Sequence, residues 1–382
     1  MQYREIGKTG MSASVVGLGA EHLQGKSYGV VEEVICAALD RDVNIMDCFM
    51  PGAEVRRNIG KAIAGRRGEL LIQGHIGSTE RNGQNDICRD PETCKRYFEE
   101  LLRCLGTDYI DLGMLFFIDS AEDFDAVFEG GIVEYALKLK KEGTIRALGA
   151  SSHNPVTARR VVETGLVDMI MFSVNPAYDM TPARANVLDS IEGDFRKDEF
   201  AGIAPERAAL YALCERRNVG ITAMKSLGAG KLLSKEHSPF GRPMTVGQCI
   251  HYALSRPAVA SVLVGCASGA QVAEAVRYLE LTEEERDYSS VIEGFQGGFK
   301  GSCVYCNHCL PCPSGIDIAA VNRYLDIALL DAANVPPSVR QHYFALKAGG
   351  GDCVSCGSCE AKCPFSVAVI DRMAKAAEIF GR

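Results

Sequence analysis

Eight cysteines near the C-terminal end of the chain stand in two short runs. The runs read Cys303-x2-Cys306-x2-Cys309-x2-Cys312-Pro313 and Cys353-x2-Cys356-x2-Cys359-x3-Cys363-Pro364. Thiolates are the usual protein ligands of iron–sulfur clusters. The second run has the bacterial spacing in which the fourth cysteine ligates the other cluster of a pair. The first run is one residue shorter before its last cysteine. The spacing predicts two [4Fe–4S] clusters.

Each cluster is expected to take ligands from both runs. Three thiolates on one tight loop can hold three corners of a cubane, but the same loop cannot reach the fourth corner, so a distant cysteine must complete the set. The expected groups are Cys303, Cys306, Cys309 and Cys363, then Cys353, Cys356, Cys359 and Cys312. The alternative is two structural zinc sites, although zinc commonly takes its four ligands in pairs.

Composition and charge limit the class of protein. Disulfide frameworks belong to small secreted chains, whereas this chain has 382 residues and an N-terminus, MQYREIGKTGMSAS, without a signal pattern. No apolar run approaches the ~20 residues that span a bilayer. A net charge of −8 does not favour nucleic acid or an anionic membrane surface. We therefore expect a cytoplasmic protein with neither kind of partner.

Short apolar runs alternate with helical patterns before the cysteine module. Strands are expected at 15–18, 43–47, 70–74, 109–115, 144–150, 167–172, 219–224 and 259–265, with helices between them, as at 30–41, 94–105 and 134–143. Eight strand–helix units predict parallel strands, and over ~250 residues they favour a closed (β/α)8 TIM barrel. No G-x-G-x-x-G follows the first strand, which counts against a Rossmann fold.

The sequence thus predicts an α/β chain of two domains. The barrel would occupy residues 1–290, and a small ferredoxin-like iron–sulfur domain with helices at 316–330 and 338–346 would occupy 291–382. Glycine-rich stretches before each cysteine run, including Gly297 and Gly298, are typical of linkers. In TIM barrels the chemistry lies at the carboxyl ends of the strands. That position selects Asp47 after the second strand and His75 after the third.

The chain resembles the aldo/keto reductase family, in the branch that carries a C-terminal ferredoxin domain. The segments that carry the resemblance are YREIGKTGMSASVVGLG, NIMDCFMPGAEVRRNIGKAI, TDYIDLGML, GTIRALGASSHNP, VGITAMKSLGAGKLL and the two cysteine runs. The resemblance implies an N-terminal hairpin before the barrel. It also implies a reductase that uses hydride from NADPH, with an Asp, a Tyr, a Lys and a His at the active site.

Most of that catalytic set is replaced here. Asp47 matches the Asp, while Gly52, His75 and Phe116 stand at the Tyr, Lys and His positions. Without a proton donor at the carbonyl oxygen, the ~10²–10⁴-fold contribution of general acid catalysis is missing. What remains is Asp47 facing His75, where the carboxylate would favour the protonated imidazole and orient its ring. The alternatives are a structural pair in a decayed pocket, and Tyr28 as a replacement phenol.

The cofactor positions match the family in part. The SLGAG segment (226–230) resembles the loop that clasps the dinucleotide pyrophosphate, where glycines allow close backbone approach. The 265–276 segment resembles the adenine-side motif, but Ala267 stands where an Arg for the 2′-phosphate is expected. The resemblance implies NAD(P)H, without a preference for NADPH, and a flavin could use the same phosphate site. The implied cofactor-binding residues are Ser151, Leu227, Gly228, Gly230, Ser268 and Gln271.

The leading hypothesis is an oxidoreductase whose clusters exchange electrons with a small-molecule substrate at the barrel mouth. A redox protein such as a ferredoxin or flavodoxin is a candidate partner. One alternative is an NAD(P)H-dependent carbonyl reductase that uses Asp47 and His75, and another is a non-catalytic electron carrier or scaffold. The long polar segment 175–207 is a candidate lid or a docking surface for the cysteine module.

Overall fold

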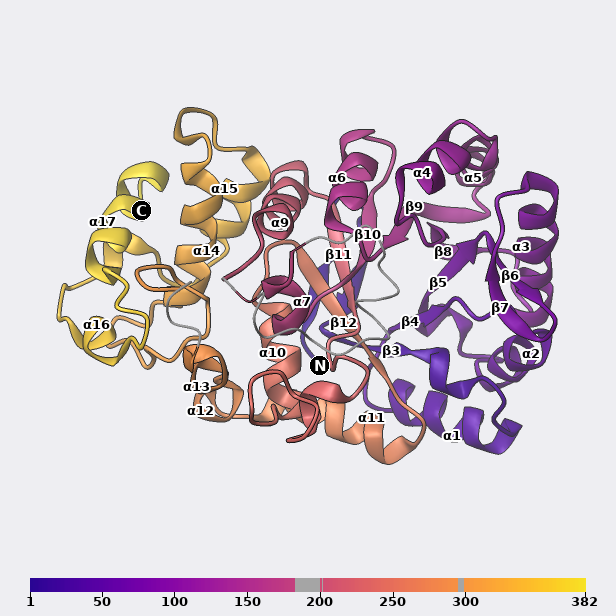
Figure 1. Cartoon of the computed structure of the whole chain (residues 1–382), viewed down its shortest axis with the longest axis horizontal. Coiled ribbons are helices and arrows are strands. Elements are labelled where there is room, and N and C mark those ends of the chain that lie inside the picture. The colour runs from indigo at the N-terminus through magenta and orange to yellow at the C-terminus, as the bar shows by residue number, and fades with distance from the viewer. Residues whose placement is uncertain (183–199, 201, 295–298) are drawn as a thin grey trace.

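The computed structural model describes residues 1–182, 200, 202–294 and 299–382. Eight parallel strands close into a barrel (Figure 1). They are β3 (Val16–Gly19), β4 (Ile45–Cys48), β5 (Leu71–Ile76), β8 (Ile110–Leu115), β9 (Ile145–Ser152), β10 (Met169–Ser173), β11 (Gly220–Met224) and β12 (Val259–Gly265). Each expected strand overlaps one of these, so the prediction of a (β/α)8 barrel is confirmed.

Methionines and aliphatic side chains fill the lower barrel interior, and a hairpin closes its floor. The hairpin pairs β1 (Tyr3–Glu5) with β2 (Ser12–Ser14). Ile6 and Met11 between these strands join the same apolar cluster as Ile45, Met114 and Met169 from the barrel wall. Successive strand residues point to opposite faces. This cluster therefore fixes which residues face the barrel interior toward the carboxyl ends of the strands.

Helices surround the barrel, and several have caps that the sequence encodes. They are α1 (Tyr28–Leu39), α2 (Ala53–Ala62), α3 (Pro91–Leu105), α4 (Ala121–Phe128), α5 (Ile132–Glu142), α6 (Pro155–Glu163), α7 (Pro176–Met180), α9 (Pro205–Arg217), α10 (Val246–Leu254) and α11 (Gly269–Val276). Asn154 caps α6 directly before a proline. Gly143 ends α5 in the left-handed conformation, with φ 80°, as expected.

A second hairpin lies between β5 and α3 and was not expected from the sequence. It pairs β6 (Ser78–Arg81) with β7 (Gln84–Ile87). Its two turn residues, Asn82 and Gly83, both have positive φ, 54° and 78°. An Asn-Gly pair is a strong signal for this turn, but the flanking residues are largely polar and lack an apolar alternation.

The C-terminal helices form a lobe beside the barrel, on the left of Figure 1. They are α12 (Glu283–Arg286), α13 (Ser289–Ile292), α14 (Ile318–Leu329), α15 (Pro337–Phe344), α16 (Ser358–Lys362) and α17 (Val369–Phe380). α14 and α15 pack against α9 of the barrel, and they confirm the two helices expected in this region. Short 3-10 turns lie at Ala20–Leu23, Arg67–Glu69, Lys231–Leu233, Arg277–Glu280, Ala332–Asn334 and Gly350–Asp352.

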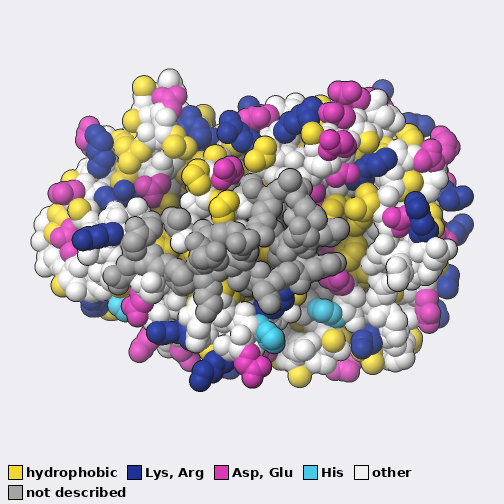
Figure 2. All heavy atoms as spheres, in the orientation of Figure 1, with side chains coloured by type: hydrophobic (Ala, Val, Ile, Leu, Met, Phe, Trp, Pro, Cys, Tyr) yellow, Lys and Arg dark blue, Asp and Glu magenta, His cyan; other side chains and the backbone are white. Residues whose placement is uncertain are grey.

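The surface carries charges of both signs. On the face shown in Figure 2, basic and acidic side chains are mixed around the rim. Within the described ranges, no helix has the length and apolar character needed to cross a bilayer. Most of the candidate lid at 175–207, namely 183–199 and 201, lies outside the described residues, as do Gly297 and Gly298.

Candidate functional site

Adjacent strands bring a carboxylate and an imidazole together inside the barrel. Asp47 Oδ1 accepts hydrogen bonds from His75 Nε2 at 2.7 Å and from Gln73 Nε2 at 3.1 Å. The parallel register sets Asp47 beside Gln73, and His75 follows two residues later on the same face. Asp47 and His75 are each 2% exposed. His75 Nδ1 is buried without a hydrogen-bond partner among the described residues.

Two aromatic rings enclose the imidazole. Phe49 and Phe116 stack on each other with ring centroids 5.9 Å apart. Both meet the His75 ring edge-on, at interplanar angles of 76° and 90°. Phe117 contacts Phe116, at 5.8 Å between centroids, and lies closer to His153, at 4.9 Å. The pair therefore lies in an apolar surround, where electrostatic interactions are stronger than in water.

Asp119 ties the loop after β8 to the end of β9. Its carboxylate accepts hydrogen bonds from Ser152 Oγ and from His153 Nδ1, both at 2.9 Å. Burial alone would raise the pKa of the Asp119 carboxyl. The charge and hydrogen bonds of His153, with that of Ser152, outweigh burial and hold the pKa below its usual range. Asp119 therefore remains ionised and fixes this loop, and His153 serves as its partner.

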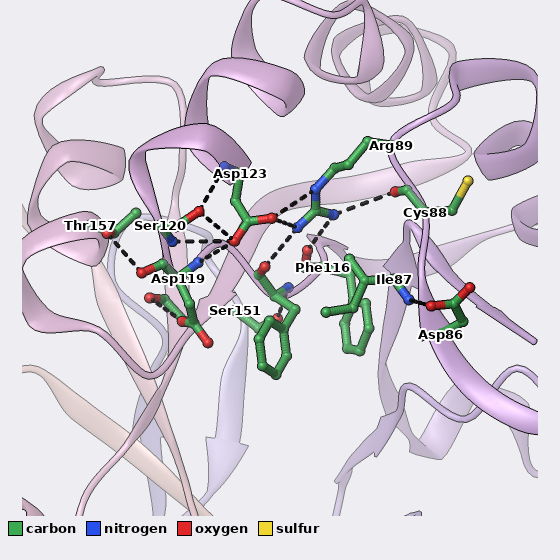
Figure 3. A network of polar contacts seen from close by, with 12 residues as sticks. Asp86, Ile87, Cys88, Arg89, Phe116, Asp119, Ser120, Asp123, Ser151 and Thr157 are labelled. Carbon is green, nitrogen blue, oxygen red and sulfur yellow. Dashed lines mark hydrogen bonds and ion pairs between the residues drawn. The ribbon is translucent and has the colours of Figure 1, made fainter. Parts of the chain in front are cut away.

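Arg89 holds the same loop from the other side, as Figure 3 shows. Its guanidinium donates to the carbonyl oxygens of Phe116 at 3.0 Å and Phe117 at 2.7 Å, and it pairs with Asp123 at 2.8 Å. Ser151 Oγ accepts from Phe117 N at 2.9 Å. Phe117 has φ 53°, which is uncommon for a residue other than glycine. These bonds fix Phe116 over His75 and place Ser151 at the barrel mouth.

The expected phosphate loop follows β11 and turns tightly. Gly228 and Gly230 have φ 57° and 84°, a conformation that glycine adopts without strain. The Gly228 N–H bonds Lys225 O, and the Gly230 N–H bonds Leu227 O. The loop thus has the close backbone approach that a phosphate would need, although these two N–H groups already have partners within the loop.

Backbone N–H groups at the start of α11, the helix expected on the adenine side of a dinucleotide, already donate hydrogen bonds to side chains of the protein. Gln271 Oε1 accepts from Ala267 N at 2.6 Å, and Ser268 Oγ accepts from Gln271 N at 3.4 Å. Glu33, from α1, accepts from Gly269 N at 2.9 Å. A carboxylate therefore lies at the helix N-terminus, where an anionic ligand group would otherwise be favoured.

The eight cysteines of the two runs line two adjacent hollows in the C-terminal lobe. One hollow, with about 340 Å³ of empty space including its opening, is lined by Cys303, Cys306, Cys309 and Cys363. The other, with about 390 Å³, is lined by Cys309, Cys312, Cys353, Cys356 and Cys359. These are the two expected ligand groups, with Cys309 on the border of both. In the part of the chain that the structure describes, no three His, Cys, Asp or Glu side chains form a group suited to a metal ion.

The two runs repeat one backbone conformation. Residues with positive φ stand two and four positions after the first cysteine of each run: Tyr305 (63°) and Asn307 (61°), then Ser355 (54°) and Gly357 (73°). In each run a further positive-φ residue follows the last cysteine by three positions, and a helix begins after six, α14 or α17. Alternation of this kind turns successive N–H groups into a concavity that binds anions, including iron–sulfur clusters.

The family model that matches this chain covers much of the barrel. Residues 15–246 match the model of the aldo/keto reductase family. An uncharacterized oxidoreductase of Bacillus subtilis, YqkF, is 26% identical over 302 residues, covering 75% of this chain and 94% of that protein. The aldo-keto reductase YhdN of the same organism is 29% identical over 164 residues, covering 40% and 47%. The holo structure of aldo-keto reductase AKR11C1 from Bacillus halodurans superposes with a TM-score of 0.59 at 22% identity, covering 77% and 96%.

Proposed function

This chain belongs to the aldo/keto reductase family, and we propose that it is an iron–sulfur oxidoreductase. Its clusters would exchange electrons with a small molecule at the barrel mouth. The lining of two adjacent hollows by the eight cysteines carries this proposal. The division into a barrel at 1–290 and a cluster domain at 291–382 is part of it, as is a cytoplasmic location, because thiol ligands remain reduced there.

The kind and number of lining residues support a four-iron cluster in each hollow, although the side chains of these described residues do not stand in a ligand arrangement. A cubane needs four thiolates spaced around a volume, and each hollow has cysteines from both runs at its edge. Backbone N–H groups in such positive-φ loops would donate to cluster sulfur, and such hydrogen bonds tune the reduction potential. A bound cluster would supply one-electron transfer. The chain would supply the thiolates, the backbone donors and the apolar cover.

The barrel mouth supports chemistry that differs from the usual mechanism of the family. Gly52 and Phe116 offer no proton donor. His75, held by Asp47 and enclosed by Phe49, is a titratable group near the expected catalytic positions. Asp47 fixes the His75 ring and balances its charge when it is protonated. His75 Nδ1 is then the atom at which a proton is held for a bound ligand.

The same pair supports a second candidate, an NAD(P)H-dependent carbonyl reductase. The resemblance implies that Ser151, Leu227, Gly228 and Gly230 would contact the nicotinamide and pyrophosphate, and the positive φ of the two glycines supports this role. On the adenine side the fit is poorer, because Glu33 already accepts the Gly269 N–H. Ser268 and Gln271 cap α11 itself. A flavin, which needs only the phosphate loop, is an alternative ligand.

A redox protein such as a ferredoxin or flavodoxin would exchange electrons at the second hollow. Cys356 on its rim is exposed, and the neighbouring Val354 is 67% exposed. By contrast, Cys306 at the first hollow is buried. Electron transfer between proteins requires a redox centre close to the surface. The second hollow is therefore the better site for electron exchange with a partner protein.

The decisive experiment is purification without oxygen, followed by analysis of iron, acid-labile sulfide and zinc. Two clusters require about eight iron atoms per chain and as much sulfide. A broad visible band that dithionite bleaches would support the proposal, while zinc in place of iron would overturn it. Mass spectrometry of the released small molecules then identifies a dinucleotide or flavin. Bleaching by NADH or NADPH would show that dinucleotide and clusters exchange electrons.

A further inference from the structure

Arg256 is a buried cation between the barrel and the first cysteine run. It lies two residues beyond the end of α10 and is 1% exposed. Its Nη2 donates to Ser255 Oγ at 2.9 Å, to Tyr288 OH at 3.0 Å and to Val304 O at 2.6 Å. Val304 follows the ligand Cys303 directly. The guanidinium therefore binds the backbone of the ligand loop itself.

Among the residues that the structure describes, no carboxylate forms a direct ion pair with this guanidinium. Among the described residues Arg256 has no ion-pair partner within 4.0 Å, and its Nε and Nη1 are buried without hydrogen bonds. It lies over the rings of Tyr252 and Tyr305, at 4.4 and 5.0 Å from their centroids. The Asp179 carboxylate pairs directly with Arg207, at 2.7 Å. Burial would lower the pKa of Arg256, but the charge of Asp179, after those of Tyr288 and Tyr252, helps to raise it from a distance. An isolated buried charge is costly unless an opposite charge lies near it.

The first hollow would supply that opposite charge. Val304, whose carbonyl Arg256 holds, lines this hollow together with its four cysteines. Four thiolates around an iron–sulfide core give a net negative group, and attraction to a nearby cation is strong where water is excluded. The residues that line the second hollow include none of the three hydrogen-bond partners of Arg256. The arginine therefore distinguishes the two sites.

We propose that Arg256 is the counter-charge of the cluster held by Cys303, Cys306, Cys309 and Cys363, and that it sets the reduction potential of this cluster above that of the other. The inference rests on the proposed function. Reduction adds negative charge, which a fixed buried cation stabilises. An electron delivered by an external reductant would then reside on the cluster in the first hollow, called the inner cluster. The cluster in the second hollow, called the outer cluster, would be the one that receives the electron from the reductant.

The test is a redox titration with dithionite, followed by electron paramagnetic resonance. Cys306→Ala and Cys356→Ala chains, which each remove a ligand from one hollow, assign the two signals. In Arg256→Met the midpoint potential of the inner cluster is expected to fall while that of the outer cluster stays in place. Arg256→Lys, which keeps the charge, is expected to remain closer to wild type. Arg216→Met is the matched control, because this arginine also binds the C-terminal lobe, through Ile327 O and Asn334 O, away from both hollows.

Several results would overturn the inference. Two assigned clusters whose potentials are unchanged in Arg256→Met would remove it and leave the proposed function intact, whereas a wild-type chain without clusters would remove both. An equal fall in Arg216→Met would show a general effect of surface charge. If Arg256→Met retains no iron, Arg256→Gln, which keeps N–H donors but carries no charge, takes its place in the titration. An unchanged potential of the assigned inner cluster in Arg256→Gln would then overturn the inference.

Discussion

His75 Nε2 donates a hydrogen bond to Asp47 Oδ1 over 2.7 Å inside the barrel. A carboxylate can only accept, so the bond places the Nε2 hydrogen toward Asp47 and leaves Nδ1 as the ring nitrogen without a partner among the described residues. Gln73 donates to the same oxygen, and both donors lie on β5. This arrangement orients an imidazole at the strand end where the sequence resemblance implies the lysine position of the family.

We predict that His75→Ala lowers the turnover of any small-molecule reduction by about 10²–10⁴-fold, the usual contribution of a general acid. His75→Gln should lose nearly as much, because its amide can replace the bond to Asp47 but cannot carry the proton. The measurement is steady-state turnover with a panel of small aldehydes and ketones, or with the ligand identified by mass. Unchanged turnover in either variant would remove His75 from the mechanism.

The matched control for that series is Cys48→Ala. Cys48 follows Asp47 in β4, so its side chain points to the opposite face, and it is fully buried. Burial raises the pKa of its thiol to about 12, which makes the thiolate scarce at neutral pH. We expect Cys48→Ala to lose some stability through packing while keeping turnover per folded molecule. An equal loss of turnover would indicate a general disturbance of β4.

A second prediction concerns the cysteine hollows. Cys306→Ala and Cys356→Ala each remove a ligand from a different hollow, so each chain should retain about half of the iron and one set of cluster signals. Cys249→Ala is the control, because Cys249 is buried in α10 and lines neither hollow. Iron and sulfide analysis after anaerobic purification decides. Full iron content in both variants would contradict the assignment.

The barrel could be predicted from the sequence because its signals are local. Each strand is a short apolar run followed by a helical pattern, and Gly143 marks a helix end by its type alone. The two cysteine groups follow from spacing in the same way. Gln73 was missed, although it stands two residues before His75 and therefore shares its face. The two-residue repeat of side-chain direction along a strand therefore places Gln73 on the face that also carries His75, next to Asp47.

Other features arise from contacts between distant segments, which no local pattern encodes. Arg89 binds the carbonyl of Phe116 across 27 positions, and Glu33 reaches the Gly269 N–H across 236 positions. The stacking of Phe49 on Phe116 likewise depends on the order of strands around the barrel. Each of these contacts becomes visible only when the closed sheet brings strand ends together.

The position of Glu33 gives a third prediction, on dinucleotide affinity. Glu33→Ala frees the Gly269 N–H and removes a negative charge from the α11 N-terminus. An anion at such a position is worth roughly 1 kcal/mol, so NADPH should bind about fivefold more tightly. Glu32→Ala is the control, because Glu32 accepts from Tyr28 on its own helix. Fluorescence titration measures both dissociation constants. Equal gains in the two variants would show that only net charge matters.

The last prediction concerns the contact between the barrel and the C-terminal lobe, where Glu215 of α9 pairs with His342 of α15. The hydrogen bond and charge of Glu215 raise the pKa of His342, against the effect of burial. Burial would raise the pKa of Glu215, but the hydrogen bond and charge of His342 outweigh it and lower that pKa. Stability from protonated His342 is fully present below about pH 6.5 and is lost as pH rises through its folded pKa. Stability from ionised Glu215 is present above about pH 4.3 and is lost as pH falls through its folded pKa.

We therefore expect His342→Ala to lower the free energy of unfolding most at about pH 5.5. The difference in this free energy between the variant and wild type should shrink at lower and at higher pH. Denaturant unfolding across pH, with the exposed His237→Ala as control, measures this difference, and a constant difference would show that His342 contributes through packing alone.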